Sequence, residues 1–402
     1  MNKIQTQLVS CLNAAIHGKK IEVNVNKYIE WKSLIEEAKI HNIEALIYSS
    51  ISSKSLENID DRLLDIWKKN TFMSGAYQIN HINQISKVLH RFNEERISVI
   101  VLKGLVIRDL YPKKELRTMC DADILVKAQE LDNVRNILCN LGYQESGSSE
   151  IHLDFKKGSS NIEIHWTIAS EDYFERIPDF EMDMWKNTIQ VQIGNSYALS
   201  MNDEYLALHL CIHMAKHIRY RGFGVRQLCD LVLLVEQKKN LINWDNFIEK
   251  IKLCGVYKFT VCIFMICNKL FGMEIPNNLD DKRLVDDKCL NLLIEDIFSN
   301  GVHGRGNSSA TVAKELARTH GNYKYSILQR YITFLLPSTD ELSIRYNYIE
   351  RFKILTPIAW VNYFLKKVFS SKYSILDKAK FLIFGINISK KRNRLLNWLE
   401  LQ

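Results

Sequence analysis

The chain has 402 residues, a formal net charge of +8 and a hydrophobic fraction of 47%, which supports a full apolar core and excludes an intrinsically disordered protein. Its nine cysteines are scattered without a Cys-x-x-Cys pair, which indicates reduced, buried thiols in a cytosolic protein rather than a disulfide framework or a zinc cluster. The longest strongly apolar stretch, residues 259–267, is far below the ~20 residues that span a bilayer. The first residues lack the apolar segment of a signal peptide.

The N-terminal part of the chain has helical periodicity. Residues 28–51 are predicted to form a pair of helices that breaks near His41 and Asn42. Residues 61–95 are predicted to form one or two long helices, because apolar residues between positions 79 and 89 recur on one helical face. A helical region is therefore expected to precede the first strand.

A short apolar run at residues 98–102 is typical of a buried strand, and Lys103 and Gly104 follow it directly. Residues 105–110 then have the pattern of a short helix. This order is typical of phosphate sites, because glycine lets a backbone approach closely and free N–H groups at a helix start attract anions. The spacing of a Walker loop is absent. A strand-to-helix turn that needs glycine explains the same residues without a phosphate.

An Arg-x-x-x-Asp-x-Asp signature at Arg117, Asp121 and Asp123 is the most informative feature of the chain. Residues 121–126 alternate as a strand, so the two aspartates share one face and apolar residues share the other. Mg²⁺ prefers oxygen ligands and often takes only one or two protein carboxylates, so this pair is well placed for a divalent cation. Two solvated acids at an exposed strand end are the alternative, although like charges on one strand face repel each other.

A third acid follows on another predicted strand. Residues 161–166 alternate, with Glu163 and His165 on one face. A single helix-like segment, residues 130–141, separates this strand from the one that carries the aspartates, so the two strands are expected to be neighbours. Glu163 then adds a third carboxylate to the pair. A solvent-facing strand with one glutamate is the alternative.

In this order, these pieces resemble the nucleotidyltransferase superfamily with the polymerase-β-like fold. More closely, they resemble a poorly characterised bacterial nucleotidyltransferase family often encoded beside polysaccharide or peptide biosynthesis genes. The resemblance covers about residues 30–250 and rests on segments 101–104, 110–111, 117, 121–126, 162–166, 209–217 and 226–231. The chain departs from the superfamily in two places. It has Lys103-Gly104-Leu105 where Gly-Ser or Gly-Gly is usual, and Glu163 where Asp is common.

The resemblance implies an α+β fold with a small mixed-sheet nucleotidyltransferase core, N-terminal helices and a larger helical C-terminal region. It implies metal-dependent transfer of NMP from an NTP such as ATP to a hydroxyl on a small molecule, glycan or peptide, with release of pyrophosphate. Asp121, Asp123 and Glu163 are then catalytic and hold two Mg²⁺ ions. Glu163 completes the metal near the acceptor or acts as its base.

The resemblance also assigns phosphate and nucleotide contacts. Lys103 and Gly104 are expected to hold phosphate. Arg117 either neutralises phosphate or pairs with Asp121 and orients it. The remaining nucleotide contacts are expected from His165, His213, His217, Arg226 and Asp230.

His209, His213 and His217 recur at i, i+4 and i+8 and so lie on one helical stripe. The stripe binds zinc, with Asp230 or Glu204 as a third ligand, or it packs on the core with its polar groups hydrogen-bonded. As a third interpretation, implied by the resemblance, it lines the cleft opposite the carboxylates with other polar residues. These are Lys216, Arg226 and Asp230. The last two, four residues apart, also have the spacing to pair with each other.

Four regions are expected along the chain. They are an N-terminal helical region (1–96), the α/β core (97–200), a helical domain that completes the cleft (201–300) and a basic helical region (301–402). Residues 301–307 contain three glycines and are expected to form a loop that marks a boundary or a mobile lid.

Residues 366–394 carry nine Lys or Arg against one Asp, with apolar and aromatic residues between them. Such a stretch either contacts an anionic membrane peripherally, or holds nucleic acid, or forms a terminal helix with a solvated basic face. Two other functions therefore stay open. One is toxin-like transfer to RNA or protein, which is less favoured because no RNA-binding module is recognisable. The other is a non-catalytic nucleotide-binding scaffold, against which the three carboxylates count.

Overall fold

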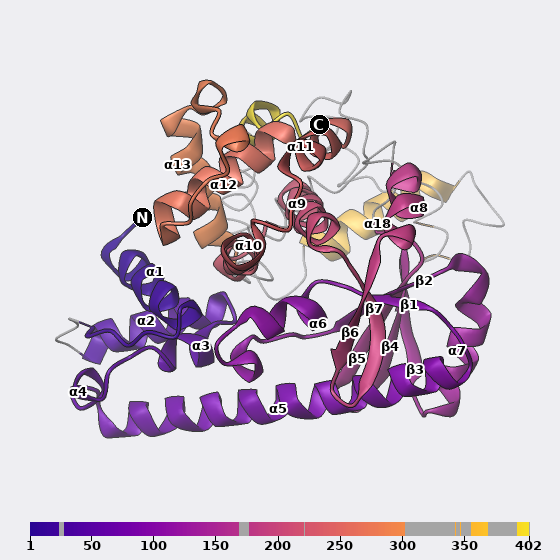
Figure 1. The fold of residues 1–402 in the computed structure, drawn as a ribbon, viewed down its shortest axis with the longest axis horizontal. Helices are drawn as coiled ribbons and strands as arrows, with labels where there is room; N and C mark the ends of the chain where they lie inside the picture. Colours follow the sequence, from indigo (N-terminus) through magenta and orange to yellow (C-terminus); the bar gives the residue numbers. More distant parts are fainter. Residues whose placement is uncertain are drawn as a thin grey trace. The chain divides into compact units, whose positions relative to one another are not determined.

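The computed structural model describes residues 1–23, 28–168, 177–220, 222–301, 342, 346, 355–368 and 392–401 (Figure 1). The chain forms two compact units, residues 1–217 with 222–303 and residues 218–221 with 304–402. Every residue of the predicted site lies in the first unit. The second unit contains α18 (Thr356–Val368). The predicted loop at 301–307 and the basic stretch 366–394 lie outside the described residues, except at their ends.

Within the described residues, helices precede the sheet. They are α1 (Lys3–Ile16), α2 (Tyr28–Ile40), α3 (Glu44–Tyr48), α4 (Ser53–Leu56) and α5 (Asp61–Glu94). The predicted break between α2 and α3 is confirmed, and Asn42 adopts a φ of 52° there, which asparagine tolerates better than most residues. The predicted long helical region is the single helix α5. It begins after Asp60, whose side chain accepts a hydrogen bond from the backbone N–H of Leu63.

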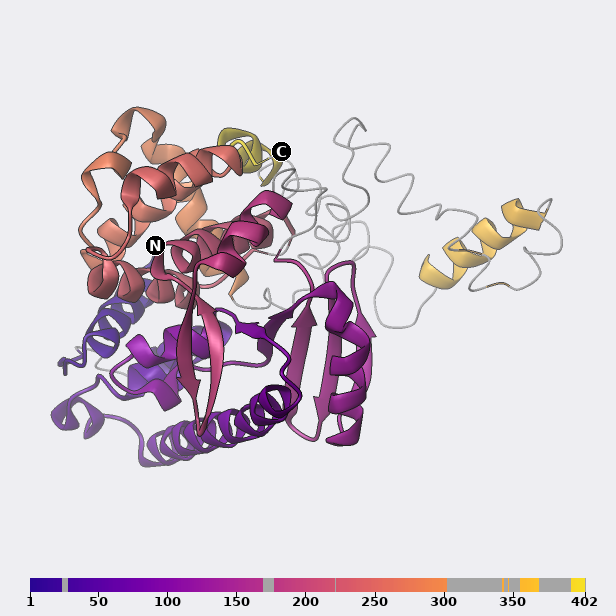
Figure 2. The same cartoon turned by 45° about the vertical axis from the view of Figure 1, so that its right-hand side comes forward.

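The described strands form a seven-stranded mixed sheet in the order β3-β4-β5-β2-β1-β7-β6 (Figure 2). They are β1 (Val99–Val101), β2 (Ala122–Val126), β3 (Gln144–Ser148), β4 (His152–Lys157), β5 (Ser160–His165), β6 (Thr188–Ile193) and β7 (Ser196–Met201). β2 pairs with β5 in parallel, as β1 does with β7, and the other neighbours are antiparallel. The predicted adjacency of the acid-bearing strands is therefore confirmed. The sequence patterns above do not predict the β3–β4 and β6–β7 hairpins.

One face of the sheet forms the core with α5 and α7 (Leu131–Asn140), which lie along it in Figures 1 and 2. Phe92 of α5 and Leu138 of α7 are fully buried against this face, together with Ile124 of β2. Because side chains alternate along a strand, Asp123 and Glu163 point to the opposite face. The burial of one face thus determines which residues line the other.

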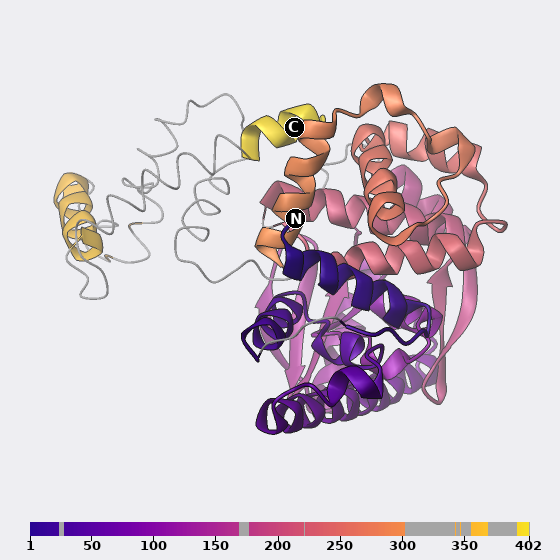
Figure 3. The same ribbon diagram turned by 90° about the vertical axis from the view of Figure 1, so that its left-hand side faces the viewer.

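Helices dominate the chain after the sheet. The described ones in the first unit are α8 (Ile177–Lys186), α9 (Asp203–Tyr220, whose last turn belongs to the second unit), α10 (Val225–Lys238), α11 (Trp244–Leu253), α12 (Tyr257–Phe271) and α13 (Asp287–Asn300). α1 contacts both α2 and α12, which joins the N-terminal helices to the later ones (Figure 3). Cys211, Cys262 and Cys267 are buried thiols, as predicted. Sheet and helices together confirm the α+β class. In the part of the chain that the structure describes, no helix is both long and apolar enough to cross a membrane.

Candidate active site

The polar face of the sheet brings the predicted acids together. The register places Asp123 of β2 beside Glu163 of β5, and Glu163 beside Asp154 of β4. His165 of β5 lies beside His152 of β4. Since register partners point to the same face of a sheet, these strands gather carboxylates and imidazoles into one patch.

Asp123 is the buried centre of this patch, with 8% of its surface exposed. Its Oδ1 lies 3.2 Å from Nζ of Lys103 and 3.0 Å from Nε2 of His165. Burial alone would raise the pKa of Asp123, but the Lys103 ammonium and the His165 hydrogen bond hold it well below its usual range. His165 also lies 3.2 Å from Oε2 of Glu163. Although burial opposes protonation, these two carboxylates raise the pKa of His165.

Asp121 differs from Asp123, because its carboxylate makes no hydrogen bond or ion pair with any described residue. Burial, and then the like charges of Asp123 and Glu163, raise the pKa of Asp121 to about 7. The charges of Lys103 and Arg226 act in the opposite direction but do not cancel this rise. A buried carboxylate beside two others gains much from a hard divalent cation, which prefers oxygen ligands. The arrangement therefore fits the predicted magnesium site.

Lys103 and Gly104 connect β1 to α6 (Gly104–Ile107). Lys103 has a φ of 41°, in the left-handed region that favours glycine, and its side chain reaches Asp123. At residue 104, by contrast, close packing explains why the residue is a glycine. A Cβ added to it would lie 2.5 Å from Nη1 of Arg117 and 2.6 Å from Sδ of Met119. The backbone thus approaches the buried arginine closely, as a glycine permits.

Arg117 lies in a buried network that joins α10 to the segment before β2. Its Nε and Nη2 donate to the two carboxylate oxygens of Asp230, at 3.2 and 2.5 Å, and Tyr111 donates to Oδ1 of the same aspartate at 2.7 Å. Arg226 donates to the carbonyl and hydroxyl oxygens of Thr118, at 2.6 and 3.0 Å. No hydrogen bond or ion pair between described residues joins these side chains to the three acids. In the structure, Arg117 pairs with Asp230 rather than Asp121, and Arg226 contacts Thr118 rather than Asp230.

We expect Asp230→Ala to lower the free energy of unfolding by about 3–5 kcal/mol, because it leaves the buried Arg117 without its partner. Asp109→Ala is the matched control, since Asp109 is half-exposed and its pairing with Lys114 spans 3.5 Å, so a loss of at most about 1 kcal/mol is expected. Urea unfolding of both variants measures the difference. A fully stable Asp230→Ala protein with weakened NTP binding would instead support the nucleotide contact.

α9 places His209 over the polar face. The side chain is 3% exposed, and neither ring nitrogen has a hydrogen-bond partner among the described residues. Burial, together with the charge of Lys103, lowers the pKa of His209 to about 3. The charge of Asp123 acts on the same ring, which shows that α9 runs close to the carboxylates. His209 is therefore a buried, neutral imidazole within range of the charges of Lys103 and Asp123.

His213 and His217 contact each other, with 3.0 Å between their Nε2 atoms. Burial and the charge of Lys103 lower the pKa of His213 well below its usual range, so it also lies near the acids. Neither predicted third zinc ligand is available to the stripe. Glu204 pairs with Lys250 at 2.7 Å, and Asp230 belongs to the buried network above. The structure thus favours a stripe beside the carboxylates over a zinc site.

His152 and Asp154 belong to the patch, but the sequence patterns above do not assign His152 to it. Nε2 of His152 lies 3.2 Å from Oδ1 of Asp154 and 3.9 Å from Oε2 of Glu163. A signal exists in the sequence. Residues 152–156 alternate polar and apolar shortly before the turn at Gly158, which is the pattern of a hairpin with the strand that carries Glu163.

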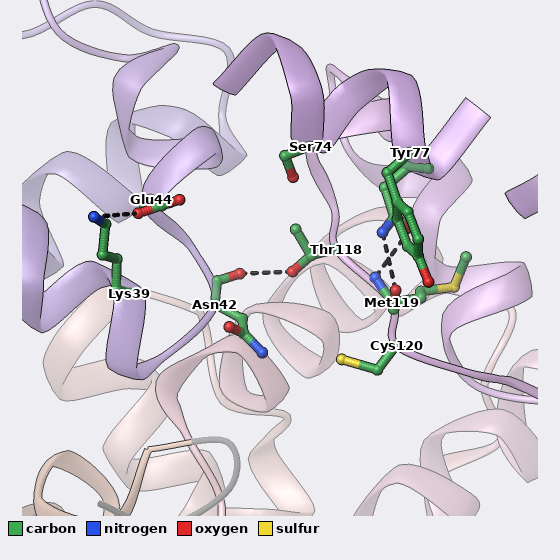
Figure 4. A pocket seen from close by; sticks show the side chains of 9 residues that line it. Lys39, Asn42, Glu44, Ser74, Tyr77, Thr118, Met119 and Cys120 are labelled. Carbon is green, nitrogen blue, oxygen red and sulfur yellow. Dashed lines mark hydrogen bonds and ion pairs between the residues drawn. The ribbon is translucent and has the colours of Figure 1, made fainter. Parts of the chain in front are cut away.

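A cavity of about 340 Å³ lies beside the segment that leads into β2 (Figure 4). Its walls are Lys39, Asn42, Glu44, Ser74, Tyr77, Gln78, Thr118, Met119 and Cys120. The Gln78 side chain donates to the carbonyl of Met119 at 2.9 Å and accepts from its N–H at 3.1 Å. The Tyr77 hydroxyl donates to the carbonyl of Ser159 at 2.7 Å. The cavity is therefore preformed, and Cys120 places it one residue from the first carboxylate.

Comparison with known proteins supports an assignment by family. The model of a family described as uncharacterised nucleotidyltransferase matches residues 27–272, more than half of the chain. Among the curated proteins, none matches. A solution structure of the antibiotic-resistance factor ANT(2'')-Ia is similar at 12% identity and a TM-score of 0.32, over 40% of this chain and 85% of that chain. So weak a likeness decides neither fold nor substrate.

Proposed function

The chain belongs to this nucleotidyltransferase family and is an enzyme of that class, and we propose that it moves NMP from an NTP to a hydroxyl acceptor with release of pyrophosphate. The observation that carries the proposal is that Asp123 and Glu163 are partners on one face of the sheet, with Asp121 directly before β2 and within range of both their charges. Burial and the repulsion from these two acids raise the pKa of Asp121 to about 7, so the three carboxylates together favour a bound cation. Transfer from a triphosphate is chemistry that such a trio serves.

Asp121, Asp123 and Glu163 are the residues that would hold divalent cations. When bound, Mg²⁺ would supply charge that offsets the triphosphate and lowers the pKa of the acceptor hydroxyl. Asp121 fits this task because its carboxylate makes no hydrogen bond or ion pair among the described residues and lies beside two other acids. Asp123 fits because Lys103 and His165 keep its carboxylate ionised.

The remaining steps are assigned to the chain's own residues. The acceptor oxygen attacks the α-phosphorus, the bond to the β-phosphate breaks, and Glu163 accepts the hydroxyl proton. His165 orients Glu163 through its Nε2 at 3.2 Å. Lys103 and the partly buried Lys216 are our candidates for stabilising the departing pyrophosphate, because Lys103 contacts Asp123 and the charges of Glu163 and Asp123 act on Lys216. The preformed cavity beside Cys120 is our candidate for the acceptor.

We expect Lys103→Ala to weaken NTP binding about 10- to 100-fold and nucleoside binding much less, because a charged hydrogen bond contributes roughly 1.5–3 kcal/mol. Lys103→Gly should do the same without straining the backbone, since the φ of 41° suits glycine. Calorimetric titration with NTP and nucleoside measures both affinities. Lys114→Ala, which removes an exposed lysine outside the site, is the control. Equal losses for both ligands would reassign Lys103 to a structural role.

Labelled transfer tests the function itself. The protein is incubated with each α-labelled NTP, Mg²⁺ and a lysate that is afterwards divided into small-molecule, glycan, RNA and protein fractions. Label in the small-molecule or glycan fraction, absent with Asp121→Asn, is the expected result. Label in RNA or protein would move the acceptor to that class. A protein that binds NTP but labels nothing in any fraction would support the nucleotide-binding scaffold.

A further inference from the structure

Two histidines and one glutamate come together on the polar face. Within the described residues, His152, Glu163 and His165 form a group whose possible ligand atoms all lie within 4.8 Å of one another. Oε2 of Glu163 is 3.2 Å from Nε2 of His165 and 3.9 Å from Nε2 of His152. Donors bonded at ~2.0–2.1 Å around a tetrahedral ion are ~3.3 Å apart, so Glu163 and His165 already have this spacing and the His152 ring would have to move closer.

Carboxylate oxygens surround both imidazole nitrogens. Nε2 of His152 lies 3.2 Å from Oδ1 of Asp154, and Nε2 of His165 lies 3.0 Å from Oδ1 of Asp123. Nε2 of each histidine therefore has two carboxylate neighbours. A single N–H on that nitrogen can donate a well-aligned hydrogen bond to only one of them. A divalent ion at this point would replace these N–H contacts, including those of His165 to Asp123 and Glu163, because each Nε2 would give its lone pair to the ion and carry no proton.

Ser149 orients the His152 ring from behind, because its Oγ lies 2.8 Å from Nδ1. The same hydroxyl lies 3.4 Å from the carbonyl of His152. When it donates to that carbonyl, Oγ accepts from Nδ1–H, and Nε2, which lies 3.2 Å from Asp154 and 3.9 Å from Glu163, keeps its lone pair for an ion. Metal-binding histidines commonly have such a partner on the other ring nitrogen.

We propose that His152, Glu163 and His165 bind a divalent transition-metal ion of the zinc class, at a site adjacent to the one assigned to Asp121 and Asp123. Imidazole nitrogens suit zinc and cobalt, whereas Mg²⁺ prefers an all-oxygen shell. The shared Glu163 places the transition metal on the β4 side of the trio. The inference deepens the proposed function, but its test needs no substrate.

Co²⁺ titration of the metal-stripped full-length protein tests the site. Visible d–d absorption reports the ligand field, and competition with Zn²⁺ gives the affinity of the colourless ion. We expect one Co²⁺ per chain that excess Mg²⁺ does not displace. His152→Ala should lower Co²⁺ affinity at least ~100-fold, since even the loss of an outer partner costs about 10–100-fold. Ser149→Ala should lower Co²⁺ affinity about 10-fold, because it removes the outer partner of the His152 ring.

Two controls make the result specific. His90→Ala removes a histidine that also lies near a glutamate, 3.5 Å from Glu94 on the exposed side of α5, and should leave Co²⁺ binding unchanged. Asp121→Asn should abolish NMP transfer and leave the Co²⁺ spectrum intact. Circular dichroism of each variant confirms the fold.

Two outcomes would overturn the site: absence of Co²⁺ binding in the wild type, or binding that His152→Ala leaves unchanged. Either would make these side chains a hydrogen-bonded network that only orients Glu163. Binding of Co²⁺ without NMP transfer would support the site and contradict the proposed function. Transfer without Co²⁺ binding would do the reverse, so the two failures are distinguishable.

Discussion

Asp121→Asn should abolish turnover and at the same time leave the metal-free protein at least as stable as the wild type. The reason is that the Asp121 carboxylate has no hydrogen bond or ion pair among the described residues, whereas burial and its acidic neighbours raise its pKa to about 7. Turnover should fall more than roughly 100-fold, because removing a metal ligand exceeds the loss seen for its outer partners. Pyrophosphate release and thermal unfolding, measured on one preparation, check both halves.

The pH dependence gives a second readout of the same residue. Because the folded state raises the pKa of Asp121 above its ordinary value of 3.8, the native protein binds more protons than the unfolded chain between pH 3.8 and about 7. The free energy of unfolding should therefore fall as pH rises through that window, and Asp121→Asn should reduce that fall. Asp109→Asn, an exposed acid near Lys114, is the control. Normal turnover in Asp121→Asn would contradict the assignment of Asp121 as a metal-binding residue.

Strand alternation made much of the site predictable. Asp123 and Glu163 each sit between apolar residues that enter the core, so their shared face follows from local pattern alone. The adjacency of their strands was expected because so little chain separates them, and the register confirms it. The single helix α5 followed from periodicity, which is reliable over a long segment.

The buried arginine network depends on long-range contacts, which a local sequence pattern does not reveal. Arg117 and Asp230 are separated by 113 residues, and their pairing depends on how α10 packs against the segment before β2. Sequence alone therefore offered phosphate as a plausible partner for the arginine. The left-handed backbone of Lys103, with a φ of 41°, could not be predicted either, because a lysine gives no sequence signal for such a turn. His152 joins the site only through the β4–β5 register.

Glu163→Gln should separate chemistry from binding. The amide is nearly isosteric and its oxygen can still accept from Nε2 of His165, 3.2 Å away in the wild type, so the strand and its neighbours should not move. NTP affinity should stay near that of the wild type, because Asp121 and Asp123 remain. Turnover should fall by ~10²–10⁴-fold, the usual effect of losing a general base, since an amide accepts no proton at neutral pH. Calorimetry and single-turnover kinetics measure the two quantities.

Asp154→Asn is the matched control, because Asp154 lies beside Glu163 in the register but on the outer strand β4. If Glu163 is the base, Asp154→Asn should retain turnover within about threefold, far outside the ~10²–10⁴-fold range of base removal. If the two effects are exchanged, Asp154 is the third acid and Glu163 only supports His165. If neither variant loses turnover, the two-carboxylate pair acts without a third acid, and the mechanism proposed for this face of the sheet is wrong.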